Sequence, residues 1–489
     1  MSLVLSAIHE HGLINPASVA LSDQHLRLTY GELEHQVEAT AAALDRAFGG
    51  ELSGRPVGLA LENRPAWVIL DLSLIRLGWA NIPLPGFFTA AQREHALENA
   101  GAGLLIKTGA ELGEQFSVAG EMLAIETLAH KKTALPSGTA KVTYTSGTTG
   151  QPKGVCLSQA QMEAVASSIV SVIGDEFAGR HMPLLPLSIL LENVAGLYSS
   201  LIAGGRYHVL APEAIGLANP FKPELGRLLQ AIREENATSL ILVPDLLRAL
   251  IVSMGFSGTR LPQLNLVAVG GAKVAPQLLD QAQALGLPVF EGYGLSECSS
   301  VVALNTPQAR TIGSVGRILP HLTVEVGTDG ELLVGPRPFL GYAGGQLHAG
   351  PVHTGDLGSL DADGYLRIVG RKSNTIITAH GRNIAPEWVE SELLAQPEIR
   401  QALVFGEAQS ELGALIVPLM PEMLPEAVAA AVARANQNLP VYAQVGRWKL
   451  RPPFDAALGE LTGNGRPRRS VLLKHEQAFI SSDSVRSFA

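Results

Sequence analysis

Apolar and polar positions along the chain alternate between strand-like and helix-like patterns. Residues 264–269 form an apolar run typical of a strand, residues 276–286 carry apolar side chains at helical spacing, and residues 289–290 begin another apolar strand. The order recurs where residues 238–243 precede a Leu-rich helix that begins at Pro244. A strand, helix, strand order is typical of a parallel sheet with right-handed crossovers.

Turn and helix signals divide the rest of the chain. Thr29, followed three residues later by Glu32, predicts a capping box at the start of an amphipathic helix. Residues 328–330 and 361–364 have the composition of hairpin turns, so we expect antiparallel β structure after about residue 310. Further on, the pattern becomes α+β. Its predicted elements are helices over 386–394 and 425–435 and strands around 403–405 and 415–417.

These patterns predict an α/β fold with two domains. Residues 1–372 are expected to form a large N-terminal domain of parallel-sheet α/β layers plus a β region, and residues 373–489 a small, mobile α+β domain. The most hydrophobic stretch, residues 181–205, contains Glu192 and two prolines, so it falls short of the roughly 20 clean apolar residues of a membrane-spanning helix. We interpret it as buried core.

Composition and charge exclude several functional classes. Of 489 residues, 46% are hydrophobic and 17% charged, and the net charge is −9, as in a soluble, mildly acidic globular protein. The basic cluster at residues 466–469 is too short for a nucleic-acid surface. Cys156 and Cys298 give neither a disulfide framework nor a four-cysteine zinc site, and we interpret both as small buried residues. The first residues lack the features of a secretory signal, so we expect a cytoplasmic protein.

The segment with the strongest chemical signal is residues 142–157, VTYTSGTTGQPKGVCL. A loop dense in hydroxyl groups and glycines precedes Lys153, and such a loop can surround phosphate oxygens because glycine lets the backbone approach closely and each hydroxyl or amide donates. It differs from the common nucleotide P-loop, in which Gly-Lys-Ser/Thr opens a helix. A polar surface turn is the alternative, which composition alone favours. The loop residues are Thr145, Ser146, Gly147, Thr148, Thr149 and Gly150.

The ten residues TSGTTGQPKG resemble, at full length, the phosphate-loop motif of the adenylate-forming enzymes, the superfamily of acyl-CoA synthetases, luciferases and peptide-synthetase adenylation domains. Further motifs follow in the order of that family. Residues 291–297, EGYGLSE, are similar to its Tyr-Gly-x-Thr-Glu motif, with Ser296 where threonine is usual. Residues 353–356 match its Thr-Gly-Asp motif, and residues 370–371 and 381–386 resemble its hinge and the loop after the hinge. The resemblance covers nearly the whole chain.

The resemblance implies a nucleotide site with a metal ion. The phosphate loop and Lys153 would hold the phosphates, Tyr293 would stack on adenine, and Glu297 would hold Mg²⁺. Ser296 would donate to the α-phosphate, and Ser296 and Lys153 are expected to be catalytic. The other implied nucleotide-binding positions around the base and its motif are Gly271, Ala272, Glu291, Gly292 and Gly294.

The resemblance also places Asp356 on both ribose hydroxyls, which suits a carboxylate with two acceptor oxygens, and Arg371 on the ribose or phosphates. Taken alone, each residue has a plainer interpretation: Tyr293 as a core aromatic, Glu297 as a solvated acid, Asp356 as a turn residue and Arg371 as a surface ion pair. The set suits carboxylate activation, which needs charge neutralisation on the phosphates rather than a protein nucleophile.

Two departures from the family pattern stand out. Arg466 occupies the position of the lysine that usually serves adenylation, and it keeps the positive charge on a planar fork. We expect Arg466 to be catalytic in the same way. Ile189 replaces the usual histidine near the acid, and the acid pocket is expected to include Ile189, Leu191 and Gly271. This stretch is most similar to long-chain fatty acyl-CoA synthetases, and ordinary core packing is its alternative interpretation.

The resemblance implies ATP-dependent conversion of a carboxylic acid, of medium or long chain, to acyl-AMP and transfer to coenzyme A. The small domain would rotate at Ser373 and present a thiol-transfer loop with Gly381 and Arg382. ATP, Mg²⁺ and coenzyme A, or a carrier-protein phosphopantetheine, are the implied cofactors. The partners would be the acid and, if the thiol belongs to a carrier, an acyl carrier protein. Ligation of an aryl acid would also fit the motifs, as would a non-catalytic role in binding a nucleotide or an acid.

Overall fold

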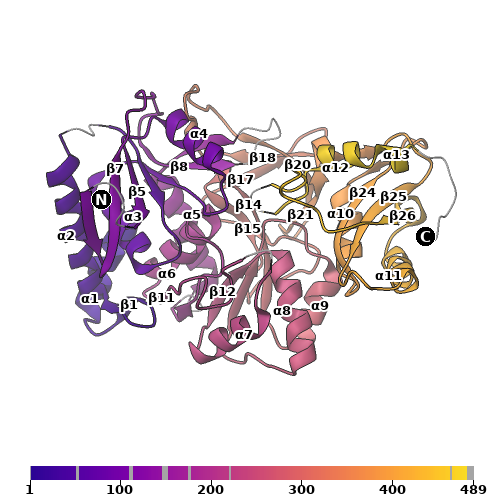
Figure 1. Ribbon diagram of the computed structural model, residues 1–489, viewed down its shortest axis with the longest axis horizontal. Coiled ribbons are helices and arrows are strands. Elements are labelled where there is room, and N and C mark those ends of the chain that lie inside the picture. Colours follow the sequence, from indigo (N-terminus) through magenta and orange to yellow (C-terminus); the bar gives the residue numbers. More distant parts are fainter. Residues whose placement is uncertain are drawn as a thin grey trace.

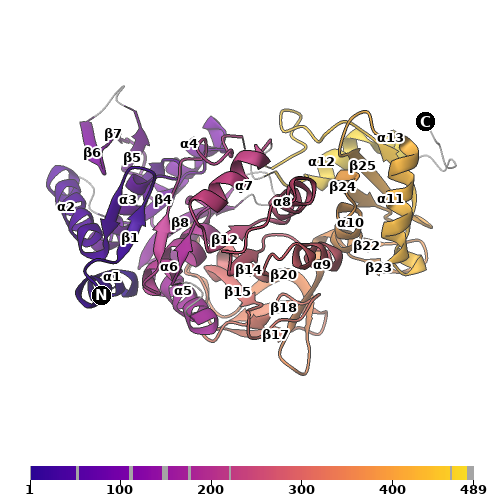
Figure 2. The same cartoon turned by 90° about the horizontal axis from the view of Figure 1, so that it is seen from below.

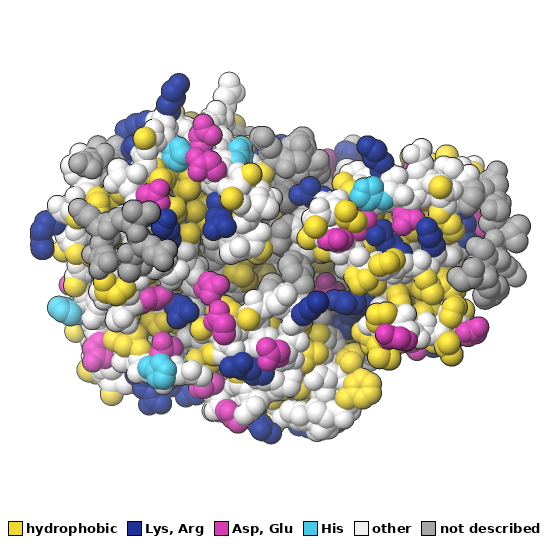
Figure 3. Space-filling view, viewed as in Figure 1, with side chains coloured by type: hydrophobic (Ala, Val, Ile, Leu, Met, Phe, Trp, Pro, Cys, Tyr) yellow, Lys and Arg dark blue, Asp and Glu magenta, His cyan; other side chains and the backbone are white. Residues whose placement is uncertain are grey.

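The computed structural model describes residues 2–50, 54–109, 114–145, 152–174, 178–219, 222–462 and 465–481. Two large sheets build the N-terminal domain, and a smaller C-terminal domain with its own sheet lies at one end of it (Figure 1). Figure 3 shows the two domains as separate lobes, with lysine and arginine side chains at their junction. The predicted fold class, α/β with a large and a small domain, is confirmed.

The first large sheet has nine strands and a parallel centre. Its strands β12, β13 and β14 are parallel, as the apolar runs predicted, and β15 returns antiparallel to β14. The strands in order across the sheet are β16 (Arg317–Ile318), β15 (Ser300–Leu304), β14 (Val289–Leu295), β13 (Leu266–Val269), β12 (Ser239–Leu242), β10 (Arg180–His181), β11 (Arg206–His208), β1 (Val19–Ser22) and β2 (Arg27–Thr29).

The second large sheet has eight strands and contains the hairpin of the phosphate-loop sequence. β8 and β9 form that hairpin, in which Thr145 pairs with Lys153. The strands in order are β19 (Gly341–Tyr342), β9 (Lys153–Ser158), β8 (Thr139–Thr145), β4 (Asn81–Pro83), β3 (Val57–Ala60), β5 (Leu104–Thr108), β7 (Glu121–Thr127) and β6 (Glu114–Val118).

Helices cover both faces of the nine-stranded sheet. Leu228, Leu247 and Leu278 of α7 (Leu225–Glu234), α8 (Pro244–Ser257) and α9 (Pro276–Ala284) belong to one apolar core with β12 and β13. Figure 2 shows α7 and α8 on the opposite side of β12 from α5 and α6. A second core joins both large sheets, and the helices of this part of the chain are α1 (Leu3–Ile14), α2 (Tyr30–Phe48), α3 (Pro65–Leu77), α4 (Ala90–Ala100), α5 (Gln159–Ile173) and α6 (Ser199–Ile202).

Local signals in the sequence account for where several of these helices begin. The Thr29 hydroxyl accepts from the amide of Glu32, whose carboxylate accepts from the amide of Thr29, so α2 begins with the predicted capping box. Most of the apolar stretch at 181–205 is buried, as predicted, and it includes a π-helix over Leu191–Tyr198. No helix in the described ranges combines the length and the apolar character needed to cross a membrane.

A four-stranded antiparallel sheet connects the large sheets to the C-terminal domain. The turn at 328–330 joins its strands β17 and β18, and the turn at 361–364 joins β20 and β21, so both predicted hairpins are confirmed. Its strands are β17 (Thr323–Val326), β18 (Glu331–Gly335), β20 (Val352–Leu360) and β21 (Leu366–Arg371).

The C-terminal domain is a three-stranded sheet covered on both faces. Along β24, Val404 belongs to a core with α10 and α11, and the next residue, Phe405, belongs to a core with α12 on the opposite face. The predicted α+β character is confirmed. The elements are β22 (Ile376–Ile377), β23 (Asn383–Ile384), α10 (Pro386–Leu394), β24 (Ile399–Phe405), β25 (Leu412–Pro418), α11 (Pro425–Gln437), β26 (Val445–Leu450), α12 (Arg469–His475) and α13 (Gln477–Ile480).

Candidate functional site

The hairpin of β8 and β9 places Lys153 at the end of the phosphate-loop sequence. The loop residues Ser146, Gly147, Thr148, Thr149 and Gly150 lie outside the described residues, whereas Thr145 and Lys153, a pair in the hairpin register, are both described. The ammonium of Lys153 lies 5.7 Å from the ring centroid of Tyr342, within the range of a cation–π contact. Lys153 is therefore held at the mouth of the hairpin.

Tyr342 joins Lys153 to Glu297. The Tyr342 hydroxyl donates to a Glu297 carboxylate oxygen at 3.1 Å. Glu297 lies in a short 3₁₀ turn, Ser296–Cys298, that directly follows β14. Desolvation and the charge of Glu297 raise the pKa of Tyr342, so the phenol remains a donor. The proposed phosphate and metal residues thus meet around one ring that the sequence motifs did not single out.

Tyr293 and Asp356 come together from different sheets. Tyr293 lies in β14, and its hydroxyl donates to an Asp356 oxygen at 2.6 Å. Arg371, which faces Asp356 across β20 and β21, donates from Nε to the other Asp356 oxygen at 2.9 Å and from Nη1 to the Thr354 carbonyl at 2.8 Å. Burial raises the pKa of Asp356, and the charge of Arg371 opposes that shift. A carboxylate has about four acceptor positions, so these contacts leave capacity for further donors.

Arg466 reaches this group from the C-terminal domain. The Thr462 amide donates to the Arg466 carbonyl at 2.8 Å, the Arg466 amide donates to the Thr462 hydroxyl at 3.0 Å, and the Arg466 guanidinium donates to the carbonyl of Gly271 in the N-terminal domain. Gly271 follows β13 with φ of +90°, a conformation that favours glycine. Desolvation and the positive charge of Arg371 lower the pKa of Arg466, and the charge of Asp356 opposes them. Gly271 and Ala272 are exposed, and Arg466 contacts Gly271 close enough to Asp356 and Arg371 for both charges to affect it.

Close packing explains why glycine occurs at two positions of the β14 motif. A Cβ at Gly294 would lie 1.6 Å from the carbonyl oxygen of Ser300, and a Cβ at Gly292 would lie 3.0 Å from Leu304. Gly294 therefore allows β14 and β15 to approach. Glu291 is buried beside Lys273, and burial raises its pKa from 4.5 to about 7. Ser296 is half-buried at the start of the 3₁₀ turn.

The segment assigned to the acid pocket precedes and enters the π-helix. Ile189 and Leu191 are half-buried, whereas the residues that follow them in the π-helix are fully buried. The buried Glu192 carboxylate contacts Nε2 of His181 at 2.9 Å and accepts from the Tyr207 hydroxyl at 3.0 Å. Two apolar side chains thus retain accessible surface in this otherwise buried segment.

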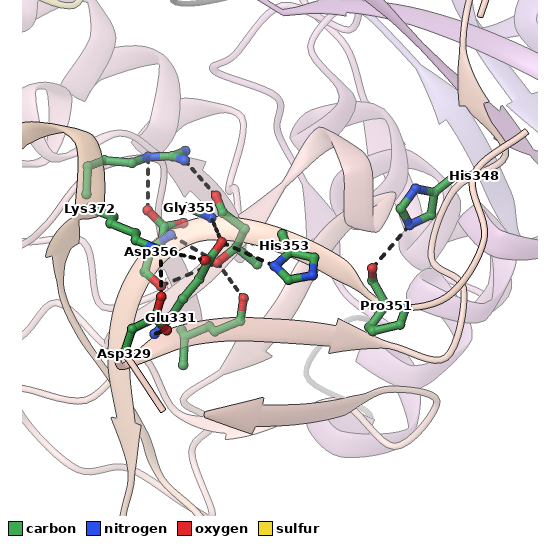
Figure 4. Close-up of polar contacts among 11 residues, drawn as sticks. Asp329, Glu331, His348, Pro351, His353, Gly355, Asp356 and Lys372 are labelled. Carbon is green, nitrogen blue, oxygen red and sulfur yellow. Dashed lines mark hydrogen bonds and ion pairs between the residues drawn. The ribbon is translucent and has the colours of Figure 1, made fainter. Parts of the chain in front are cut away.

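The residue predicted to be the hinge, Ser373, lies beside an ion-pair cluster. Ser373 is exposed in a 3₁₀ turn, Lys372–Asn374. Figure 4 shows Lys372 pointing to Asp329 and Glu331, at 2.6 and 3.1 Å, while Glu331 also accepts from the amide of Gly355 at 3.0 Å. These contacts fix the N-terminal side of the turn to β18 and β20. Their exposure to solvent makes them worth little to overall stability.

Gly381 and Arg382, the residues predicted for a thiol-transfer loop, lie in the C-terminal domain between β22 and β23. Gly381 has φ of +70° in the turn between β22 and β23, and the guanidinium of Arg382 lies 5.6 Å from the ring centroid of Tyr442. Neither residue has a hydrogen bond or ion pair with Tyr293, Glu297 or Asp356 within the described ranges. Cys156 and Cys298 are both buried, as expected.

Two family models match the chain: AMP-binding enzyme over residues 9–342 and AMP-binding enzyme C-terminal domain over residues 373–483. A long-chain-fatty-acid–CoA ligase, FadD15, of Mycobacterium bovis is 27% identical, over 91% of this chain and 90% of its own. A 2-succinylbenzoate–CoA ligase of Bacillus velezensis is also 27% identical, over 94% of this chain and 95% of its own. Among solved structures, the anthranilate CoA ligase AuaEII in complex with anthranoyl-AMP has a TM-score of 0.83 at 17% identity, over 99% of this chain and 98% of that chain.

Proposed function

Because the chain belongs to the AMP-binding enzyme family of the adenylate-forming superfamily, we propose that it activates a medium- or long-chain carboxylic acid as its acyl-adenylate and passes the acyl group to coenzyme A. The class of reaction is that of an AMP-forming acid–thiol ligase. The acid, the thiol acceptor and the roles of individual residues are the parts that the proposal adds.

One observation carries the proposal: residues from both large sheets, the four-stranded sheet and the C-terminal domain form two groups of contacts, which β14 and the turn after it connect through Tyr293 and Glu297. Tyr293 and Arg371 both contact Asp356, and Arg466 donates to Gly271 beside them. Lys153 and Glu297 both contact Tyr342, Lys153 through the ring and Glu297 through the hydroxyl. Cationic groups, a ribose-binding carboxylate and an aromatic ring are the parts that an ATP-dependent activation needs.

The chemistry follows from the charges of this group. A carboxylate oxygen of the acid attacks the α-phosphorus of ATP, the bond from that phosphorus to the bridging oxygen breaks, and pyrophosphate leaves with the bond's electron pair. Lys153 and Arg466 would neutralise the negative charge of the phosphates and of the attacking acid. Ser296, directly after β14, would donate to the α-phosphate, and Gly271 and Ala272 would border the base. The loop at 145–150 would hold the remaining phosphates.

Glu297 fits the requirements of a Mg²⁺ ligand. Mg²⁺ prefers carboxylate oxygens and keeps several waters, so one or two carboxylates with phosphate oxygens complete its coordination. Glu297 is half-buried rather than enclosed, and its contact with Tyr342 orients the carboxylate. The ion would neutralise phosphate charge when bound. Lys153, over the ring of Tyr342, would add positive charge for the same phosphates.

The proposed acid class rests on the segment before the π-helix. Ile189 and Leu191 present apolar surface, and Glu192, the buried carboxylate nearby, already pairs with His181 and Tyr207. An ammonium group on the substrate would need a carboxylate partner, so an aliphatic acid fits better than an amino acid. The relatives described above act, by name, on aliphatic and aromatic acids, which makes an aryl acid the second candidate.

For thiol transfer, the C-terminal domain would have to bring its thiol-transfer loop, in place of Arg466, close to the acyl-adenylate. We place the domain boundary at residues 372 and 373, with Ser373 as the hinge and Gly381 and Arg382 in the loop that meets the thiol. The sulfur attacks the acyl carbon, its proton passes to solvent, and AMP leaves as the acyl–oxygen bond breaks. Coenzyme A is the proposed acceptor, in line with the CoA ligases among the relatives.

An acid panel tests the proposal. Acid-dependent exchange of pyrophosphate into ATP is measured with hexanoate, dodecanoate, hexadecanoate, benzoate and phenylalanine, and AMP release is measured with and without coenzyme A. We expect the strongest exchange with dodecanoate or hexadecanoate and AMP release that depends on coenzyme A. Strongest exchange with benzoate would favour aryl-acid ligation, and acid-dependent exchange with no AMP release in response to coenzyme A would favour a carrier protein. No exchange with any acid would contradict catalysis.

A further inference from the structure

A single arginine of the N-terminal domain contacts three backbone carbonyls of the C-terminal domain. Arg248, in α8, donates from Nη1 to the carbonyls of Leu394 at 3.1 Å and Ile399 at 2.8 Å, and from Nη2 to that of Arg400 at 2.7 Å. Leu394 is the last residue of α10, and the other two begin β24. The guanidinium therefore binds the carbonyl end of a helix, where a cation is favoured.

The surroundings of Arg248 make these bonds specific to one domain orientation. Its side chain is only 17% exposed, and burial lowers its pKa. Its one carboxylate neighbour within the described residues, Asp245, is 79% exposed and 3.5 Å away, so the carbonyls are its main partners. Figures 1 and 2 both show α8 and α9 beside the part of the C-terminal domain that carries α10. Any large rotation of that domain would break all three bonds together.

The same orientation places Arg466 against Gly271. Both contacts cross between the domains, but Arg466 lies within the candidate site and Arg248 lies outside it. We propose that Arg248 is a positioning residue: it stabilises the domain orientation in which Arg466 serves adenylation, and its bonds to α10 and β24 must break before the thiol loop can approach. This inference rests on the proposed function, because Arg466 acts only if the chain forms an acyl-adenylate.

The proposal separates the two half-reactions. Arg248→Ala should reduce acid-dependent pyrophosphate exchange by about tenfold, the effect of losing charge-assisted hydrogen bonds, and leave thioester formation from supplied acyl-AMP unchanged or faster. The exchange rate of Arg248→Lys should lie between those of Arg248→Ala and the unmodified protein, because one ammonium cannot reproduce a planar guanidinium that donates to three carbonyls. Arg260→Ala is the matched control, since that exposed arginine donates to the neighbouring Thr259 carbonyl. A merely destabilising change would slow both half-reactions alike.

A distance measurement tests the orientation without any activity. Both native cysteines are buried, so spin labels can be attached to Phe256→Cys in α8 and Ala430→Cys in α11, both exposed positions. We expect one dominant distance with Arg248 present and a broader or shifted distribution with Arg248→Ala. An unchanged distribution, or equal slowing of both half-reactions, would overturn the role of Arg248. If no acid supports exchange in the unmodified protein, the proposed function fails, while a changed distribution would still establish the Arg248 contact.

Discussion

Tyr342 shows how one side chain can organise a charged site. Its ring lies under Lys153 and its hydroxyl donates to Glu297, so one side chain contacts both a cation and an anion near the hairpin. It lies in β19, which pairs with β9 at Tyr342 and Val155.

We expect Tyr342→Phe to weaken the use of Mg²⁺ without disturbing Lys153. The variant keeps the ring but removes the donor that orients Glu297, and losing such a neighbour typically costs ten- to a hundredfold in metal affinity. Half-maximal pyrophosphate exchange should therefore need about tenfold more Mg²⁺. Titrating exchange against Mg²⁺ measures this. Tyr365→Phe, whose ring lies under Arg317, is the control, and an unchanged Mg²⁺ requirement would argue against Glu297 as the metal ligand.

The role of Arg466 can also be tested with single substitutions, because alanine removes its positive charge whereas lysine keeps the charge and changes the shape of the group. Arg466→Ala should lower acid-dependent pyrophosphate exchange by about a hundredfold or more, as expected when a donor to developing negative charge is removed. Arg466→Lys should preserve or raise the rate. Exchange at saturating ATP and acid measures both variants. An alanine variant as active as the unmodified protein would refute the assignment.

At the scale of elements, the hairpin of β14 and β15 depends on a glycine. We expect Gly294→Ala to disrupt this hairpin, because the added Cβ would lie 1.6 Å from the Ser300 carbonyl oxygen. That oxygen belongs to the backbone, so relieving the clash would require β15 to move and would destabilise the fold. Gly31→Ala is the matched control, since nothing lies within 4 Å of its Cβ in the first turn of α2 and a helical alanine should stabilise by up to about 1 kcal/mol. Soluble yield and urea unfolding compare the two; equal stabilities would contradict the expected clash.

The sequence predicts elements well where a local signal decides them. Thr29 and Glu32 cap α2, Pro244 begins α8, and the apolar runs of β12 and β13 lie in a parallel sheet as their pattern indicated. The π-helix at Leu191–Tyr198 was not predicted, since an apolar stretch carries no signal for a wider turn. One requirement is visible only in the structure: a Cβ at Gly196 would lie 2.1 Å from the Glu192 carboxylate.

Sequence patterns do not predict contacts between segments that are far apart in the chain. Lys141 is fully buried, with Asp71 at 2.8 Å and the Tyr198 hydroxyl at 3.1 Å, although nothing in the sequence around it indicates a buried charge. Tyr342 and Arg248 are similar cases, since each acts through residues far away in the chain. The motif residues Tyr293, Asp356 and Arg371 do lie in contact, which supports the resemblance from which their roles were inferred.

At the scale of the whole molecule, buried charges meet where the domains join. Lys273, after β13, donates to the Ile368 carbonyl at 3.2 Å and interacts with Glu291 of its own domain and with Glu387 and Glu392 of α10. Burial lowers the pKa of Lys273 and raises those of Glu291 and Glu392. Several carboxylates thus share one lysine, so the protonation of this group changes the balance of charge at the domain contact.

The raised pKa of Glu291 makes the stability of the folded protein depend on pH. Burial raises its pKa from 4.5 in the unfolded chain to about 7 in the folded protein, so the folded state binds more protons between these values. Its contribution to stability is therefore fully present below about pH 4.5 and is lost as pH rises through about 7. Glu291→Gln removes this dependence. Relative to the unmodified protein, the variant should gain up to about 3 kcal/mol between pH 4.5 and pH 8, at 1.36 kcal/mol per pKa unit.

Urea unfolding of both proteins at pH 5, 6, 7 and 8 measures this difference. Glu325→Gln serves as the control, because Glu325 is an exposed acid in β17, far from Lys273 in the chain, and its substitution should leave the pH dependence as it is. A stability difference between Glu291→Gln and the unmodified protein that stays constant with pH would mean that Glu291 has no raised pKa. A difference that grows with pH would place a titrating carboxyl at the base of β14, directly before the residues that face the nucleotide in the proposed function.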